Sequence, residues 1–156
     1  MPPDVSSSKN IFCNLTNGAT ARLDLNSFTL EYDEDSNANK DWTLFKLDSG
    51  SQLTIGDGLA GYGTLTFHLN KLNSNSSPCL FDLTGGGVLI LERGVTIELS
   101  YPNANADKVT IFNGISDLSV YSGMTVTTTT EGGVTTTRIV VTANTVITTS
   151  SNPSFE

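Results

Sequence analysis

A degenerate repeat is the feature of this sequence that most restricts its fold. Four segments begin with an aliphatic residue followed by phenylalanine: IFCNLTNG, LFKLDSGS, LFDLTGGG and IFNGISDL. Their phenylalanines lie 31 to 36 residues apart and are Phe12, Phe45, Phe81 and Phe112. A period of this length is typical of architectures in which one repeat buries its apolar face by stacking on the next.

Two further short strands follow each phenylalanine. The second strands are expected at residues 22–25, 52–55, 88–91 and 117–120, and the third strands at 28–30, 64–67, 95–99 and 125–127. Three strands per repeat, with Gly, Asn, Asp and Ser at the corners, fit one coil of a parallel β-solenoid. We therefore predict an all-β fold, a right-handed parallel β-helix of about four coils. A β-sandwich or jelly roll with weak internal similarity is the alternative.

The stacking of coils predicts internal columns of like side chains. Phe12, Phe45, Phe81 and Phe112 are expected to form one column. The other two expected columns consist of Leu23, Leu53, Leu89 and Leu118, and of Leu25, Ile55, Leu91 and Val120.

The chain divides into three parts on this interpretation. Residues 1–9 are expected to be a flexible tail, residues 10–127 the β-helix coils, and residues 128–156 an extension of the same domain. Alternating residues around Gly132 and Gly133 predict a β-hairpin that caps or extends one end. Because its Thr- and Val-rich edge carries little charge, we expect self-association through sheet edges, with the hairpin of one molecule on the N-terminal end of another.

The repeats also resemble a known family. The stretches ATARLDLNSFTL, LFKLDSGSQLTIGDG and GTLTF resemble the right-handed parallel β-helix of the pectin-lyase-like superfamily, and more narrowly the repeats of bacterial surface and adhesin proteins. The resemblance covers roughly residues 10–127, and its motifs specify coil geometry without any chemistry. It implies a noncatalytic structural or adhesive module of a surface-exposed or fibre-forming protein, located outside the cell, at the cell surface or on a virion.

The charge balance limits the partners. Acidic residues outnumber basic ones by 16 to 8, which gives a net charge of −8 and a pI near 4.4. Nucleic acid and anionic membranes are therefore disfavoured. No stretch approaches the roughly 20 apolar residues of a membrane span, so no membrane insertion is expected, and the opening residues do not have the pattern of a signal peptide.

Two sets of residues are candidates for ligand contacts. The acidic loop that follows the first repeat suggests a calcium site formed by Asp33, Glu34, Asp35 and Asp41, but it lacks the glycine that would turn the loop, and a solvated acidic loop without a cofactor is favoured. The aromatic residues expected to be exposed near the loops are Tyr32, Trp42, Tyr62 and Tyr101, and of these Trp42, Tyr62 and Tyr101 are the candidates for contact with a glycan or a surface protein.

No catalytic set is predicted. The single histidine, His68, has no G-x-S-x-G turn to accompany it and is interpreted as a surface residue. Polysaccharide lyases of the resembled superfamily use carboxylate-bound calcium and a basic residue. Here the matching sheet offers only Lys46 beside Asp82, an exposed ion pair, while Arg22, Arg93 and Arg138 are in other strands or turns. A carbohydrate-active protein, either a small polysaccharide lyase or a glycan-binding virion spike fragment, is the alternative.

The two cysteines are expected to stay unpaired. Cys13 and Cys79 fall in the first and third repeats, so two steps of ~4.8 Å separate them, which exceeds the reach of a disulfide. Two cysteines at this spacing also do not indicate a zinc site.

Overall fold

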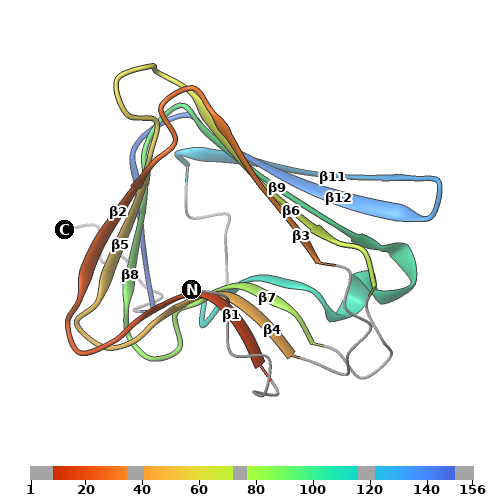
Figure 1. The fold of residues 1–156 in the computed structure, drawn as a ribbon, viewed down its shortest axis with the longest axis horizontal. Coiled ribbons are helices and arrows are strands. Elements are labelled where there is room, and N and C mark those ends of the chain that lie inside the picture. The colour runs from red at the N-terminus through yellow and green to blue at the C-terminus, as the bar shows by residue number, and fades with distance from the viewer. Residues whose placement is uncertain (1–8, 35–40, 72–76, 116–121, 150–156) are drawn as a thin grey trace.

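The computed structural model describes residues 9–34, 41–71, 77–115 and 122–149. These residues form an all-β fold, as predicted, in which three mostly parallel sheets surround a common interior (Figure 1). One short 3-10 helix, η1 (Asn103–Lys108), follows the third repeat. Of the expected tail at residues 1–9, residues 1–8 lie outside the described part of the chain, and Lys9 is the first residue of a strand.

Each of the first three repeats contributes one strand to each sheet. The first repeat contains β1 (Lys9–Leu15), β2 (Thr20–Asp24) and β3 (Thr29–Glu34). The second contains β4 (Asp41–Leu47), β5 (Gln52–Gly56) and β6 (Gly63–Leu69), and the third contains β7 (Cys79–Asp82), β8 (Val88–Leu91) and β9 (Val95–Pro102). The remaining strands are β10 (Thr110–Asn113), β11 (Met124–Glu131), β12 (Val134–Val141) and β13 (Thr145–Thr148).

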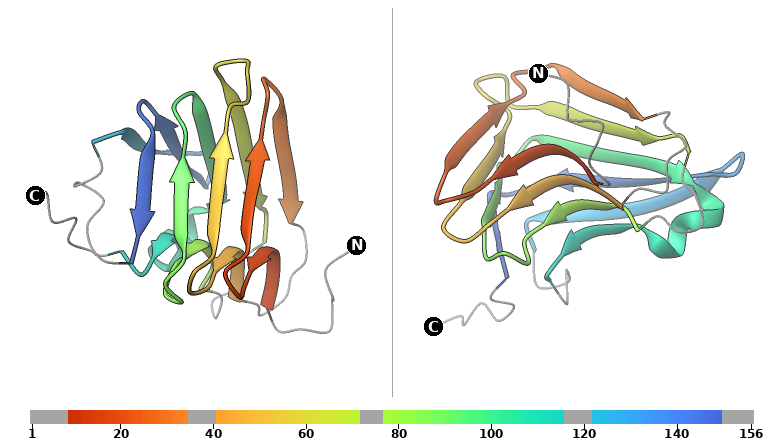
Figure 2. Two further views of the ribbon diagram at one scale, coloured as in Figure 1. Left: turned by 90° about the vertical axis from the view of Figure 1, so that its left-hand side faces the viewer. Right: turned by 60° about the horizontal axis from the view of Figure 1, so that its bottom comes forward.

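The three sheets keep the repeats in order. Sheet A has the order β1-β4-β7-β10 and is parallel throughout. Sheet B joins β2, β5 and β8 in parallel and adds β13 antiparallel to β8 (Figure 2, left). Sheet C joins β3, β6 and β9 in parallel, and the antiparallel hairpin β11–β12 then extends it beyond β9.

The corner between sheets A and B contains a glycine in each of the first three repeats. Gly18, Gly50 and Gly86 have φ values of 75°, 74° and 96°, a backbone conformation that residues with a β-carbon rarely adopt. In the first two repeats these corners lie one above the other, because a β-carbon on Gly50 would be 3.5 Å from the α-carbon of Gly18. The corner therefore has the same shape in successive repeats, which keeps the following strands in register.

The predicted aromatic column is confirmed for three of its four members. The rings of Phe45 and Phe81 are stacked with centroids 5.0 Å apart, and those of Phe81 and Phe112 with centroids 5.4 Å apart. The prediction for Phe12 is wrong, because the β1–β4 register places Cys13 opposite Phe45. Alignment of the repeats on their phenylalanines places Phe12 opposite Phe45, whereas the backbone pairing is offset from this alignment by one residue.

The columns of sheet B show a similar shift in the first repeat. Leu53 pairs with Leu89 and Ile55 with Leu91, as predicted. However, Ala21 lies opposite Leu53, and Leu23 lies opposite Ile55 rather than Leu53. The expected strand at residues 117–120, with Leu118 and Val120, lies outside the described residues.

The core is less covered in its first repeat than in the repeats that follow. One column of sheet C runs from Leu30 through Leu65 and Ile97 to Ile139. Its three later members are buried, while Leu30 is 37% exposed. Leu15 and Leu23 are likewise only partly buried, whereas their partners Leu47 and Ile55 are fully buried. Among the described residues, no strand pairs with the outer edges of β1, β2 and β3.

The expectation of about four coils is corrected at the C-terminal end. Of the predicted fourth repeat, β10 pairs in parallel with β7, but residues 125–127 belong to β11, which pairs antiparallel with β12. Gly132 and Gly133, at φ values of 57° and 78°, turn the chain back tightly, and a tight turn can join only antiparallel strands. The predicted hairpin is confirmed, and it begins at Met124, so the boundary expected at residue 127 falls inside a strand.

Candidate functional site

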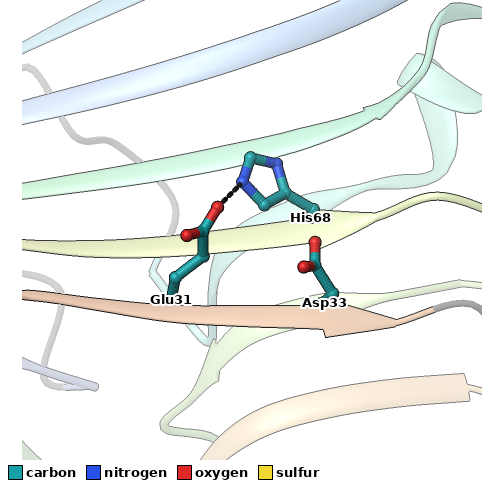
Figure 3. A group of neighbouring side chains, drawn as sticks. All are labelled: Glu31, Asp33 and His68. Atoms are coloured by element: carbon teal, nitrogen blue, oxygen red, sulfur yellow. Dashed lines mark hydrogen bonds and ion pairs between the residues drawn. The ribbon is translucent and has the colours of Figure 1, made fainter.

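A cluster of three polar side chains lies on the outer face of sheet C. Glu31 and Asp33 belong to β3, and His68 belongs to the neighbouring strand β6 (Figure 3). The register pairs Asp33 with His68 and Tyr32 with Phe67. Because side chains alternate along a strand, Tyr32 and Phe67 pack together inside while Glu31, Asp33 and His68 point outward.

The geometry of this cluster permits cation binding. Nε2 of His68 lies 2.8 Å from Oε1 of Glu31. One ligand atom from each of Glu31, Asp33 and His68 lies within 4.8 Å of the other two. Imidazole nitrogen and carboxylate oxygen are ligands for zinc and related divalent ions, so the three groups can share one such ion after small rotations. All three are accessible to solvent, where the same arrangement also serves as an ordinary surface ion pair.

The same face does not form a nucleophile–base pair within the described residues. Ser100 of β9 lies opposite His68 in the register, so a glutamate, a histidine and a serine occupy three neighbouring strands. The Ser100 hydroxyl, however, is bonded to Oγ1 of Thr136 at 3.1 Å, and no hydrogen bond joins it to His68 in this part of the structure. The serine–histidine contact that activates a hydroxyl nucleophile is therefore missing here.

The predicted cation ligands are only partly described. Asp33 is in the cluster with Glu31 and His68. The side chains of Glu34 and Asp41, and the whole of Asp35, lie outside the described residues. The proximity of His68 to Glu31 and Asp33 is not predictable from the sequence, because these residues are 37 and 35 positions away and only the register of β3 on β6 brings them together.

The predicted glycan-contact residues have different environments. Tyr62 is 62% exposed, as expected. The expectation for Tyr101 is wrong: its side chain is 6% exposed and its hydroxyl is 3.0 Å from Oγ1 of Thr137. The reason is that β9 continues to Pro102, so Tyr101 takes the next inward position of the strand. Trp42 lies in β4 opposite Asn10, and its side chain lies outside the described residues.

Lys46 lies beside Asp82 in the backbone register, as expected, but the expected ion pair between their side chains does not form. The two residues are opposite each other on β4 and β7. Nζ of Lys46 nevertheless lies 4.0 Å from Oδ1 of Asp48, and Asp82 accepts hydrogen bonds from the backbone and hydroxyl of Thr84. Asp82 turns toward the following corner because the nearby amide and hydroxyl are closer donors than the ammonium group one strand away.

A second charged cluster lies on the outer face of sheet B. Arg22 donates from both terminal nitrogens to Glu92, at 2.6 and 2.8 Å, and from Nε to Asp24 at 2.9 Å. These hydrogen bonds lower the pKa of the Glu92 and Asp24 carboxyls below their ordinary values and raise the pKa of the guanidinium. All three guanidinium nitrogens of Arg22 are thus bonded within the cluster, which is typical of a structural ion pair.

Both cysteines are free, as predicted. Cys13 is half-buried in β1, and Cys79 is buried at the start of β7. Burial in apolar surroundings raises the pKa of both thiols, and that of Cys79 to about 12. Because the thiolate is the reactive form, neither cysteine has the environment of a nucleophile.

Comparisons of the chain with protein-family models, with curated proteins and with solved structures found no match. None of the helices in the described ranges is both long and apolar enough to span a bilayer.

Proposed function

We propose that this chain is a noncatalytic structural or adhesive module, a right-handed parallel β-helix belonging to a surface-exposed or fibre-forming protein. Its three strands per repeat, each pairing with the matching strand of the next repeat, support this proposal. A right-handed path is the expected one, since parallel strands joined by crossovers almost always follow it. The resemblance of the repeats to those of bacterial surface and adhesin proteins points the same way.

The observation that carries the proposal is that one apolar column of sheet C is exposed at both of its ends. The column that begins with Leu30 continues past Ile139 to Val126, which lies opposite Ile139 in β11. Leu30 is 37% exposed and Val126 is 42% exposed, so both ends of one apolar column are open to solvent. Exposed apolar groups at a sheet edge are the usual starting point for pairing with another chain.

Strand direction makes the two ends compatible. β12 is antiparallel to β9, and β11 is antiparallel to β12, so β11 runs in the same direction as β3. If a second copy is placed along the axis of the stack, its β3 pairs in parallel with β11 of the first copy. Val126 of one copy then covers Leu30 of the next, and sheet C continues from molecule to molecule. Such a head-to-tail contact does not close on itself and produces a fibre.

Sedimentation velocity over a range of protein concentrations tests this proposal. We expect the wild-type chain to form species of increasing mass, and we expect Leu30→Lys and Val126→Lys each to stop this, because a charge is then buried at one end of the column. Leu59→Lys is the control, because it adds the same charge at a position that is fully exposed in a loop away from the sheet edges. Circular dichroism checks that each variant keeps its β structure.

A mixture of the two variants gives the sharper result. Leu30→Lys leaves the β11 end intact, and Val126→Lys leaves the β3 end intact. Equimolar mixing should therefore yield one heterodimer and no larger species. A wild-type chain that stays monomeric at all concentrations, or a mixture that stays monomeric while wild type assembles, would contradict the head-to-tail arrangement.

A further inference from the structure

A polar pocket lies at the corner where sheets B and C meet. Four corners of the chain are stacked there and are joined by backbone hydrogen bonds, from Ser27 to Tyr62, from Gly63 to Gly94 and from Gly94 to Val141, at 2.9 to 3.2 Å. The second of these corners, residues 57–62, is the loop that projects at the upper left of Figure 1. The pocket has a volume of about 530 Å³ and is lined by Asp57, Gly61, Glu92, Arg93 and Asn144.

The polar groups of the pocket include both donors and acceptors. Oδ1 of Asn144 accepts a hydrogen bond from the backbone N–H of Arg93 at 2.9 Å, which fixes the amide and leaves its Nδ2 group to donate. Glu92 is occupied by Arg22. Within the described ranges, neither the Asp57 carboxylate nor the Arg93 guanidinium has a hydrogen-bond or ion-pair partner.

Exposed apolar side chains lie on two of the corner loops that are stacked here. Tyr62 follows Gly61, a lining residue, in the sequence and is 62% exposed. Leu59 is fully exposed in the same loop. Phe28, at the stacked corner of the first repeat, is 71% exposed. An exposed aromatic residue one position from the lining, together with carboxylate, amide and guanidinium groups in the lining, is suited to a ligand that has an apolar face and a rim of hydroxyls.

We infer that this corner pocket is a binding site for a neutral saccharide. Asp57 accepts hydrogen bonds from sugar hydroxyls, Arg93 and Asn144 donate to them, and the Tyr62 ring packs against the face of the sugar. The volume lies within the usual range of small-ligand pockets, about 300–1,000 Å³. An anionic sugar is disfavoured because Asp57 and Glu92 both line the pocket and the chain carries a net charge of −8.

This inference deepens the adhesive part of the proposed function, and the two can fail separately. The test is a titration of the ¹⁵N-labelled full-length chain, followed by amide chemical shifts. The probes are maltotriose, cellotriose, mannotriose, galactotriose and chitotriose, with trigalacturonate as the anionic comparison. Val126→Lys is titrated in parallel, so that binding is measured independently of assembly.

We expect at least one neutral trisaccharide to shift the amides of residues 57–62, 92–94 and 142–144 and to leave those of sheet A unchanged. Asp57→Asn and Arg93→Gln should each weaken binding about tenfold, as loss of a charged hydrogen bond does. Arg138→Gln, which removes an exposed guanidinium from another face, should have no effect. The inference is overturned if no neutral saccharide shifts these amides, if the two pocket variants bind as tightly as wild type, or if trigalacturonate binds more tightly than every neutral probe.

Discussion

Arg22 and Glu92, 70 residues apart in the sequence, are joined by two parallel hydrogen bonds that pass over Gly56 on the strand between them. Arg22 is a residue of β2, and Glu92 directly follows β8. A β-carbon at Gly56 would come within 3.0 Å of the polar ends of Arg22, Asp24 and Glu92. Because position 56 of the middle strand has no side chain, an ion pair can connect the first and third repeats.

Replacement of two glycines by alanine should have unequal effects on stability. In Gly56→Ala the new methyl group meets only the flexible ends of exposed side chains, so we expect a loss below about 1 kcal/mol. In Gly87→Ala it meets the β-carbon and backbone carbonyl of Leu47, which cannot move aside, and we expect about 1–3 kcal/mol. Chemical denaturation of both variants measures the difference, and equal losses would contradict the packing at Gly87.

The hydrogen bonds of the Arg22 cluster predict that the free energy of unfolding depends on pH. Hydrogen bonds from Arg22 lower the pKa of Glu92 and Asp24 in the folded chain, from ordinary values of 4.5 and 3.8. A carboxyl with a lowered folded pKa contributes stability above its unfolded pKa and loses it as the pH falls through the folded value. We therefore expect wild type to lose stability below about pH 4.5, and Arg22→Gln to lose less over the same range.

Thermal unfolding between pH 6 and pH 2 checks this prediction. Arg138→Gln is the matched control, because it removes the same charge from a pair that has a single longer contact of 3.4 Å with Glu98. If Arg22→Gln and wild type lose stability in parallel throughout the range, the Arg22 cluster does not exist in solution as described.

The aromatic column predicts a different cost at its middle and at its end. Phe81 is stacked between Phe45 and Phe112, whereas Phe112 has a ring stacked on one side only. We expect Phe81→Ala to lower the free energy of unfolding by about 3–5 kcal/mol, because neighbours on both sides prevent the gap from closing. Phe112→Ala should cost less. A larger loss at Phe112 than at Phe81 would mean that the column ends elsewhere.

The burial of the thiols predicts slow chemical modification. At pH 8 a thiol whose pKa is about 12 is almost entirely protonated, and Cys79 is also covered by the core. We expect Cys79 to react with iodoacetamide at least about 100-fold more slowly in the folded chain than in urea. Mass spectrometry of peptides containing Cys13 and Cys79 separates the two sites. Rapid labelling of Cys79 in the folded chain would show that β7 opens readily.

The sequence predicts the strands of this fold better than it predicts their register. Matching the phenylalanines of the repeats places Phe12 opposite Phe45, which is one residue away from the observed pairing of Cys13 with Phe45. The leucines at or directly after the ends of β1, β4 and β7 are the more reliable guide, because they are separated by equal numbers of residues from the paired positions in sheet B. Leu15, Leu47 and Leu83 each precede by eight residues the paired positions Leu23, Ile55 and Leu91.

The sites depend on contacts that no local pattern reveals. The cluster of His68 with Glu31 and Asp33 requires the exact pairing of β3 with β6, and the environment of Tyr101 requires the hairpin to lie along β9. The corner pocket combines residues from the second and third repeats with Asn144, which follows the hairpin. The exposure of Tyr62 was predictable because it lies among turn residues between two alternating strands.

Hydrogen–deuterium exchange at low and high protein concentration tests the central claim most directly, namely that the module associates through the open edge of its first repeat. We expect the amides of β3 and of β11 to become protected at high concentration, while amides of β5 and β6 are equally protected at both concentrations. Assembly with no added protection in β3 and β11, or with added protection confined to the loop at residues 57–62, would contradict this claim.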